Sequence, residues 1–196
     1  MKKSYPTEIR VLYSDKNELE TIDGFLNRCD QWEIGLVRRA VQSLSSPGLK
    51  TFCGYVNSLA AGWIYAVIGL TLLGLQVVPA RRLLFVAGLA AAIAHMIYPI
   101  LKSRIARLRP FEFDSSLNLS MKALDRYSCP SGHIMTATVV AIPLGHTFPM
   151  FLPGIVCIWG VIAWARVSSG HHYPSDILLG ALLGSSVSLP ISSWLL

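Results

Sequence analysis

A cation, two histidines and an aspartate lie close together between residues 166 and 176, as Arg166, His171, His172 and Asp176. Apolar runs flank this segment on both sides. Ionisable groups in such a setting usually bind or transfer something, because burying them is costly. An aspartate four residues after a histidine can reach the imidazole across one helical turn and fix its tautomer. We therefore predict that Arg166, His172 and Asp176 belong to one chemical site.

A second segment carries two cations, Lys102 and Arg109, followed by Pro110. Seven residues make two helical turns, so this spacing predicts that both cations lie on one side of a helix end that Pro110 terminates. Taken alone, the pair is typical of cations that reach from an apolar helix to the membrane surface.

The third segment is Pro130-Ser-Gly-His133, which precedes an apolar run. Ser131 is suited to cap a helix whose free backbone amides bind anions, and Gly132 lets a ligand approach closely. Taken alone, a polar turn explains these residues as well. Together, the three segments supply three cations, an anion-binding helix start and two histidines, one of them with a carboxylate partner. This set suits phosphoryl transfer through a phosphohistidine.

The composition places this chemistry in a membrane protein. The chain is 53% hydrophobic and 14% charged, whereas soluble domains are about a quarter charged. The four cysteines are scattered and form no metal-binding pattern, so we predict neither a metal nor another cofactor. Nucleic acid is excluded as a partner because the chain is too apolar and has no recognition motif.

Apolar runs predict an all-α, integral-membrane helical bundle of about five transmembrane helices. Residues 1–50 are interpreted as a surface segment that contains an amphipathic interfacial helix from Asp23 to about Ser46, and residues 51–196 as the transmembrane core. Five crossings would place the three chemical segments on one face and the C-terminus on the other. The predicted crossings are residues 52–78, 83–101, 134–151, 152–165 and 177–196.

The three segments resemble, in order and spacing, the signature of the type 2 phosphatidic acid phosphatase superfamily, which includes membrane lipid-phosphate phosphatases and vanadium haloperoxidases. The resemblance implies that His172 is the nucleophile, Asp176 its orienting partner, and His133 the general acid and later the base. It also implies a metal-independent reaction. Phosphate would be bound by Lys102, Arg109, Ser131, Gly132 and Arg166. One position departs from the pattern: the usual serine before the last arginine is Ala165, so a hydroxyl that could orient Arg166 is lost.

The leading hypothesis is therefore a phosphatase that acts on a membrane lipid phosphate or diphosphate, with the bilayer as its environment. Undecaprenyl diphosphate, phosphatidic acid, phosphatidylglycerol phosphate and lipid A phosphates share the reacting group, and the sequence does not distinguish between them. Two alternatives stay open. One is a phosphotransferase that uses the same phosphohistidine, and the other is a non-catalytic protein that binds or transports lipids. The sequence predicts no oligomeric state.

Two arguments disagree about the side of the membrane on which the site lies. The face opposite the site has only Arg81 and Arg82 in its turns, so the positive-inside rule would put the more basic site face in the cytoplasm. Bacterial members of the family that the chain resembles place their site on the periplasmic side, and phosphate binding accounts for several of the cations. We therefore expect a bacterial inner-membrane protein with its site near the periplasmic face.

Overall fold

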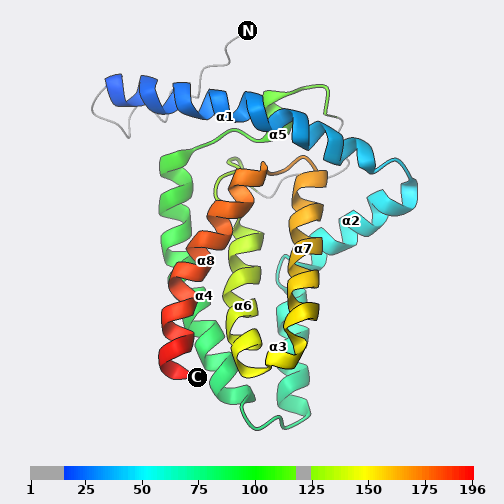
Figure 1. The fold of residues 1–196 in the computed structure, drawn as a ribbon, viewed down its shortest axis with the longest axis vertical. Coiled ribbons are helices and arrows are strands. Elements are labelled where there is room, and N and C mark those ends of the chain that lie inside the picture. The colour runs from blue at the N-terminus through cyan, green and yellow to red at the C-terminus, as the bar shows by residue number, and fades with distance from the viewer. Residues whose placement is uncertain (1–15, 118–124) are drawn as a thin grey trace.

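The computed structural model describes residues 16–117 and 125–196, and within these residues the secondary structure is helical, without a strand (Figure 1). The chain is an all-α, integral-membrane helical bundle. Its elements are α1 (Lys16–Ser43), α2 (Pro47–Leu59), α3 (Trp63–Gly74), α4 (Ala80–Ile105), α5 (Pro110–Phe113), α6 (Gly132–Thr147), the 3-10 helix η2 (Pro149–Phe151), α7 (Leu152–Ser168) and α8 (Pro174–Leu195).

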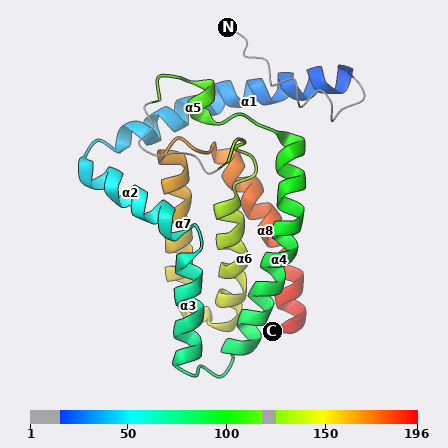
Figure 2. The ribbon, with the colours of Figure 1, turned by 180° about the vertical axis from the view of Figure 1, so that it is seen from behind.

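Three helical stretches are long and apolar enough to cross a membrane: Ala80–Phe113, Pro149–Ser168 and Pro174–Leu195. The pair α2 and α3 would make a fourth span if the two helices cross together. Helix α6 has 16 residues, about 24 Å at 1.5 Å per residue, and runs among α4, α7 and α8 (Figures 1 and 2). The number of five crossings therefore stays a prediction.

The predicted first crossing, residues 52–78, is broken. Helix α2 ends at Leu59, α3 begins at Trp63, and the two are bent by 61°. Gly62, at the start of α3, has a φ of 144°, a conformation that residues with a Cβ rarely adopt. The run contains neither charge nor proline at this point, so its hydropathy gave no sign of the break.

Helices α6 and α8 approach each other closely along a stripe of small residues on α8. A Cβ added to Gly180 would lie 2.5 Å from the carbonyl oxygen of Ser131, and one added to Gly184 would lie 2.8 Å from that of Met135. One turn further along, the Ser188 hydroxyl donates to the carbonyl of Val139 at 3.0 Å. Small residues at four-residue spacing allow backbones to meet in this way in membrane helices. The contact fixes the start of α6 against the start of α8.

Helix α1 lies across one end of the bundle (Figures 1 and 2). It ends at Ser43, and Ser46 then caps α2 by accepting a hydrogen bond from the Leu49 amide at 3.2 Å. Its buried side chains include two apolar residues, Ile34 and Val37, and two acids, Asp30 and Glu33. An interfacial location of α1 and a division of the chain at residue 50 both stay predictions.

The bundle has two distinct ends. The α3–α4 turn, the α6–α7 turn and the C-terminus lie at the end away from α1 (Figure 1). The last turn of α4, the first turns of α6 and α8, and the last turn of α7 lie at the end that α1 crosses. The three segments with candidate chemistry are therefore together beneath α1.

Candidate active site

Four of the predicted site residues come from four helix ends. Lys102 is in the last turn of α4, His133 in the first turn of α6, Arg166 in the last turn of α7, and Asp176 in the first turn of α8. Lys102, Arg109, Arg166, His172 and Asp176 are all buried, and His133 is partly buried. Five buried ionisable groups at one end of an apolar bundle make this region the candidate active site.

His172 and Asp176 face each other as the sequence predicted. The imidazole Nδ1 lies 3.6 Å from Asp176 Oδ2, which is an ion-pair distance but longer than a hydrogen bond. The same oxygen accepts a hydrogen bond from the Tyr173 amide at 2.9 Å. Because Nδ1 is turned toward the carboxylate, Nε2 is the ring nitrogen available to another group.

The electrostatic surroundings of His172 favour a neutral ring. Burial, together with the charges of Arg166, Arg109 and Lys102, lowers the pKa of His172 well below its ordinary value. The three cations therefore act on the same imidazole although they come from two separate segments of the chain. A neutral histidine keeps a free lone pair, which a nucleophile needs.

Lys102 and Arg109 share one carboxylate, that of Asp125. Lys102 Nζ donates to Asp125 Oδ2 at 2.6 Å, and the Arg109 guanidinium pairs with Oδ1 of the same side chain. Arg109 Nη1 also donates to the carbonyl of His171 at 2.7 Å, which ties it to the loop that carries His172. Burial opposes the ionisation of Asp125, but its hydrogen bond to Lys102 and the charges of Lys102 and Arg109 prevail and lower the pKa of Asp125.

The expected reason for the Lys102–Arg109 pairing was wrong, although the two cations do converge. Helix α4 ends at Ile105, four residues before Arg109. Ala106 adopts a left-handed conformation with a φ of 47°, and its amide closes the helix on the carbonyl of Lys102 at 3.0 Å. A loop and not a helical face therefore carries Arg109 to Asp125.

Arg166 is held from α2. Its Nη1 donates to Asn57 Oδ1 at 2.7 Å, and Asn57 Nδ2 in turn donates to the carbonyl of Cys53 at 3.0 Å. Ala165, which replaces the usual serine, is fully buried beside Cys53 and Leu44. In this chain the asparagine of a neighbouring helix therefore holds Arg166, where we had expected looser orientation.

The Pro-Ser-Gly turn differs in detail from its expected role. Ser131 occupies the N-cap position of α6, but its side chain makes no capping hydrogen bond and its hydroxyl has no partner among the described residues. Its amide donates to the carbonyl of Asp176 at 3.0 Å. Gly132 packs against Tyr98, whose ring carbon would lie 2.9 Å from a Cβ at this position. Gly132 thus leaves room for the Tyr98 ring, and a role toward a ligand stays a prediction.

His133 stands in the first turn of α6, and its Nε2 is buried without a hydrogen-bond partner among the described residues. An unpaired buried ring nitrogen is unusual, and such atoms call for an explanation. A nitrogen that exchanges a proton with a bound molecule would provide one.

Several residues of this region were missed by sequence reasoning. Asp125, Asn57 and Arg107 each contact a predicted site residue, and Asp30 and Glu33 reach the region from α1. Asp30 and Glu33 are three residues apart on a helix and so share a face, which was the only available sign that they act together. No sequence feature identified the partner of that face.

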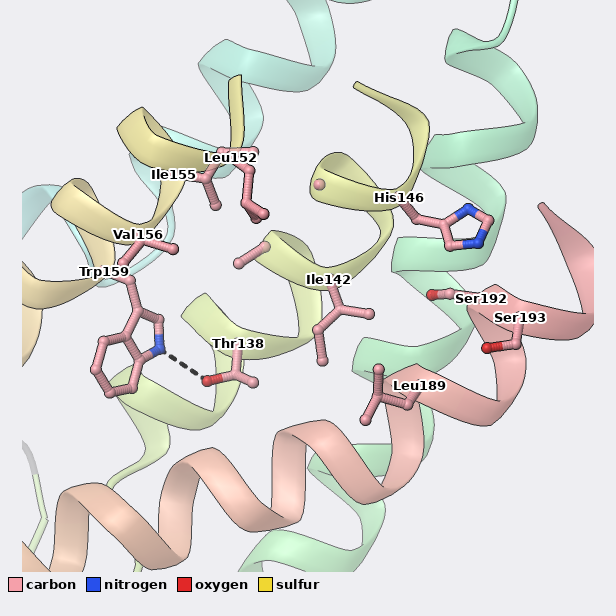
Figure 3. Close-up of a pocket in the computed structure, with 12 residues that line it drawn as sticks. Thr138, Ile142, His146, Leu152, Ile155, Val156, Trp159, Leu189, Ser192 and Ser193 are labelled. Carbon is pink, nitrogen blue, oxygen red and sulfur yellow. Dashed lines mark hydrogen bonds between the residues drawn. The ribbon is translucent and has the colours of Figure 1, made fainter. Parts of the chain in front are cut away.

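No group of three or more histidine, cysteine, aspartate or glutamate side chains that could hold a metal ion occurs in residues 16–117 and 125–196. At the other end of the bundle, an apolar cavity of about 380 Å³ lies between α6, α7 and α8 (Figure 3). Its lining includes Trp159, whose indole donates to Thr138 at 2.9 Å, and His146. This cavity suits hydrocarbon, whereas the charged region beneath α1 suits an anion.

Known proteins resemble this chain in both sequence and fold. A profile of the PAP2 superfamily matches residues 82–196. The decaprenylphosphoryl-5-phosphoribose phosphatase of Mycobacterium tuberculosis is 33% identical over 159 residues, which cover 81% of this chain and 83% of that protein. The undecaprenyl-diphosphatase of Sulfolobus acidocaldarius is 32% identical over 126 residues, covering 63% and 61% respectively. The transmembrane PAP2 type phosphatidylglycerolphosphate phosphatase of Bacillus subtilis has a similar fold, with a TM-score of 0.66 at 21% identity over 86% of each chain.

Proposed function

The chain belongs to the PAP2 superfamily, and from this premise we propose that it is an integral-membrane phosphatase that hydrolyses a lipid phosphate or diphosphate through a phosphohistidine on His172. One observation carries the proposal. The charges of three buried cations act on a neutral His172 whose Nδ1 faces Asp176, so that Nε2 is left to attack phosphorus. The cations that would hold the phosphate oxygens are Lys102, Arg109 and Arg166.

In the first step, His172 Nε2 attacks phosphorus, a P–N bond forms, and the bond between phosphorus and the lipid oxygen breaks. His133 donates a proton to the leaving oxygen, for which the bound phosphate must first raise the pKa of His133, because burial and the charge of Arg166 lower it to about 3. The imidazole becomes positively charged as the bond forms, and Asp176 stabilises that charge. Equatorial oxygens of the transferring phosphoryl group gain negative charge, which the buried cations stabilise.

In the second step, water attacks the phosphohistidine, the P–N bond breaks and inorganic phosphate leaves. His133, now neutral, accepts the proton of the attacking water. The same residue thus serves as acid and then as base, and the site returns to its starting protonation state. This cycle consumes only water.

Polyprenyl lipids are the substrates to test first. The names of the two sequence relatives given above both specify a polyprenyl phosphate or diphosphate compound, whereas the similar fold belongs to a phosphatase of a glycerophospholipid. The likeness in sequence carries more weight here than the likeness in fold, because a shared fold at 21% identity shows the arrangement of helices and not the side chains of the site. We therefore propose that a polyprenyl-linked phosphate is the preferred class.

The test is a phosphate-release panel with purified protein in detergent micelles, over polyprenyl phosphate and diphosphate, phosphatidic acid, phosphatidylglycerol phosphate and lipid A phosphates. We expect His172→Ala and His133→Ala to lose release from the preferred lipid while remaining folded. His146→Gln is the matched control, because His146 lies at the other end of the helix that carries His133. Full activity of the His172 variant would disprove the mechanism, and transfer of labelled phosphate to an added lipid acceptor would favour a phosphotransferase.

We also propose that the site faces the periplasm of a bacterial inner membrane. The C-terminus lies at the end of the bundle away from the site (Figure 1), so this orientation requires a cytoplasmic C-terminus. A reporter that works only in the cytoplasm should therefore be active when it is fused after Leu196. Activity of a reporter that requires export would contradict the orientation and leave the proposed chemistry untouched.

A further inference from the structure

Arg107 is the centre of a buried ion cluster that the proposed mechanism does not use. Its Nε donates to Asp30 Oδ1 at 2.7 Å, its Nη2 to Glu33 Oε2 at 2.7 Å, and its Nη1 to Asp176 Oδ1 at 2.8 Å. The side chain is only 3% exposed and its guanidinium lies 3.9 Å from the centre of the Tyr173 ring. All three guanidinium nitrogens thus donate to carboxylates, an arrangement that does not suit a phosphate ligand.

The cluster joins α1 to the first turn of α8. Glu33 accepts hydrogen bonds from the amide and the hydroxyl of Ser175 at 2.8 and 2.7 Å, and Ser175 Oγ also accepts from Arg107 Nη1 at 2.5 Å. Ser175 immediately precedes Asp176. Glu33 of α1 therefore holds the backbone and the side chain of the residue that precedes the proposed orienting carboxylate, and Asp30 reaches the cluster through Arg107.

The two oxygens of Asp176 are divided between two tasks. Oδ1 accepts from Arg107, and Oδ2 accepts from the Tyr173 amide and faces His172. The carboxylate cannot rotate toward or away from the imidazole without breaking its contact with Arg107. The direction in which Asp176 presents Oδ2 is therefore set by the Tyr173 amide, which holds Oδ2, together with Arg107, which holds Oδ1.

We infer that Arg107 is a positioning residue that acts on His172 through Asp176, and that Asp30 and Glu33 of α1 hold the Arg107 guanidinium in place. The inference rests on the proposed function, since it assigns a role toward the proposed nucleophile. It gives α1 a role in catalysis, because α1 then helps to fix Asp176, the charge partner of the proposed nucleophile.

This role predicts that substitution of Arg107 lowers kcat while KM changes little. Lysine keeps the charge of Arg107 but donates from a single point and cannot span three carboxylates as a planar fork does. We expect Arg107→Lys to lower kcat by about 10- to 100-fold, the range for losing a hydrogen bond to a charged group, with KM changed less than about twofold. Arg104→Lys is the matched control, because Arg104 is exposed in the last turn of α4. It should keep both constants.

The decisive measurement is a double-mutant cycle with Asp176→Asn, followed as phosphate release in single turnovers. If Arg107 acts through Asp176, Arg107→Lys should lower the rate by less than about twofold in the Asp176→Asn background. Equal losses in both backgrounds, or a KM that rises in place of a fall in kcat, would overturn the inference. Should Arg107→Lys fail to accumulate as folded protein, the near-isosteric Glu33→Gln variant enters the same cycle and should show the same dependence on Asp176.

The cycle also separates this inference from the proposed function. A normal rate for Asp176→Asn would refute the proposed role of Asp176 and, with it, the role inferred for Arg107. A slow Asp176→Asn enzyme beside a normal Arg107→Lys enzyme would refute the inference alone.

Discussion

Arg107 and Arg109 are two residues apart, yet they belong to different regions of the site. Arg109 pairs with Asp125, whose side chain is 43% exposed. Solvent and a competing anion can therefore reach this ion pair. Arg107 is enclosed by Asp30, Glu33 and Asp176, whose side chains are at most 6% exposed. We call these the outer cluster (Lys102, Arg109, Arg166, Asp125) and the inner cluster (Arg107, Asp30, Glu33, Asp176).

The difference shows that the partner, and not the residue type, decides what a buried arginine does. A partly exposed carboxylate can be displaced, which leaves its cation available for a phosphate. A cation that is bound by three buried carboxylates stays paired within the protein. The inner cluster should therefore govern stability and the geometry of His172, and the outer cluster should govern substrate binding. Four substitutions test this division, beginning with the largest expected effect.

Arg107→Met should cause the largest loss of stability. Removing one partner of a buried ion cluster leaves its remaining charges uncompensated, which typically costs about 3–5 kcal/mol in the free energy of unfolding. Adding Glu33→Gln should restore part of the loss, because it removes one of the stranded charges. Unfolding in mixed micelles measures both variants, and an unchanged midpoint for Arg107→Met would show that the inner cluster is not structural.

Arg109→Gln should leave the fold intact but reduce kcat/KM by about 100- to 1,000-fold, as expected for losing a group that stabilises developing charge. Phosphate release measures the effect, with the exposed Arg104→Gln as control. If instead the variant unfolded as readily as Arg107→Met, the two arginines would not differ in the way that their partners indicate.

Asn57→Ala should reduce kcat/KM by about tenfold, because Arg166 loses the side chain that holds its guanidinium and a hydrogen bond to a charged group is lost. The exposed neighbour Ser58 provides the control Ser58→Ala. Restoring the usual serine with Ala165→Ser should not compensate, since Ala165 is fully buried against α2. Recovery of activity in the Asn57→Ala, Ala165→Ser double variant would contradict this account.

Asp125→Asn should have the smallest effect and the opposite sign. Asp125 occupies the cations that we expect to bind phosphate, so removing its charge should tighten the binding of inorganic phosphate by roughly two- to tenfold, in keeping with a partly exposed pair. Calorimetry with purified protein measures the dissociation constants. Weaker binding by the variant would mean that Asp125 helps to hold phosphate and does not compete with it.

The pH dependence of that difference follows from the lowered pKa of Asp125. A carboxylate with a depressed pKa keeps its charge through neutral pH and loses it only as the pH falls below its ordinary value, about 4. The wild type and Asp125→Asn should therefore differ at pH 7 and converge as the pH falls below about 4. A difference that persists at the lower pH would show that the charge of Asp125 is not its cause.

Sequence reasoning found the three cations of the outer cluster and the two proposed catalytic histidines, but of the inner cluster it found only Asp176. Lys102, His133 and His172 lie in short segments of distinctive spacing, and that spacing can be read from the sequence alone. Asp30 and Arg107 are 77 residues apart, and an acid on an amphipathic helix gives no sign of whether its face meets solvent or a buried guanidinium. The break between α2 and α3 was hidden because it depends on the backbone conformation at Gly62 and not on hydropathy.

The close contact of α6 with α8 has a consequence for how such a site diversifies. Gly180 and Gly184 meet backbone carbonyls, so the separation of the two helix starts is set by main-chain atoms. Leu178, Leu179 and Leu182 on the same helix are exposed on the bundle surface and take no part in that contact. The lipid-facing surface of α8 can therefore vary in sequence at these leucines while the glycine contacts keep the first turns of α6 and α8 in place.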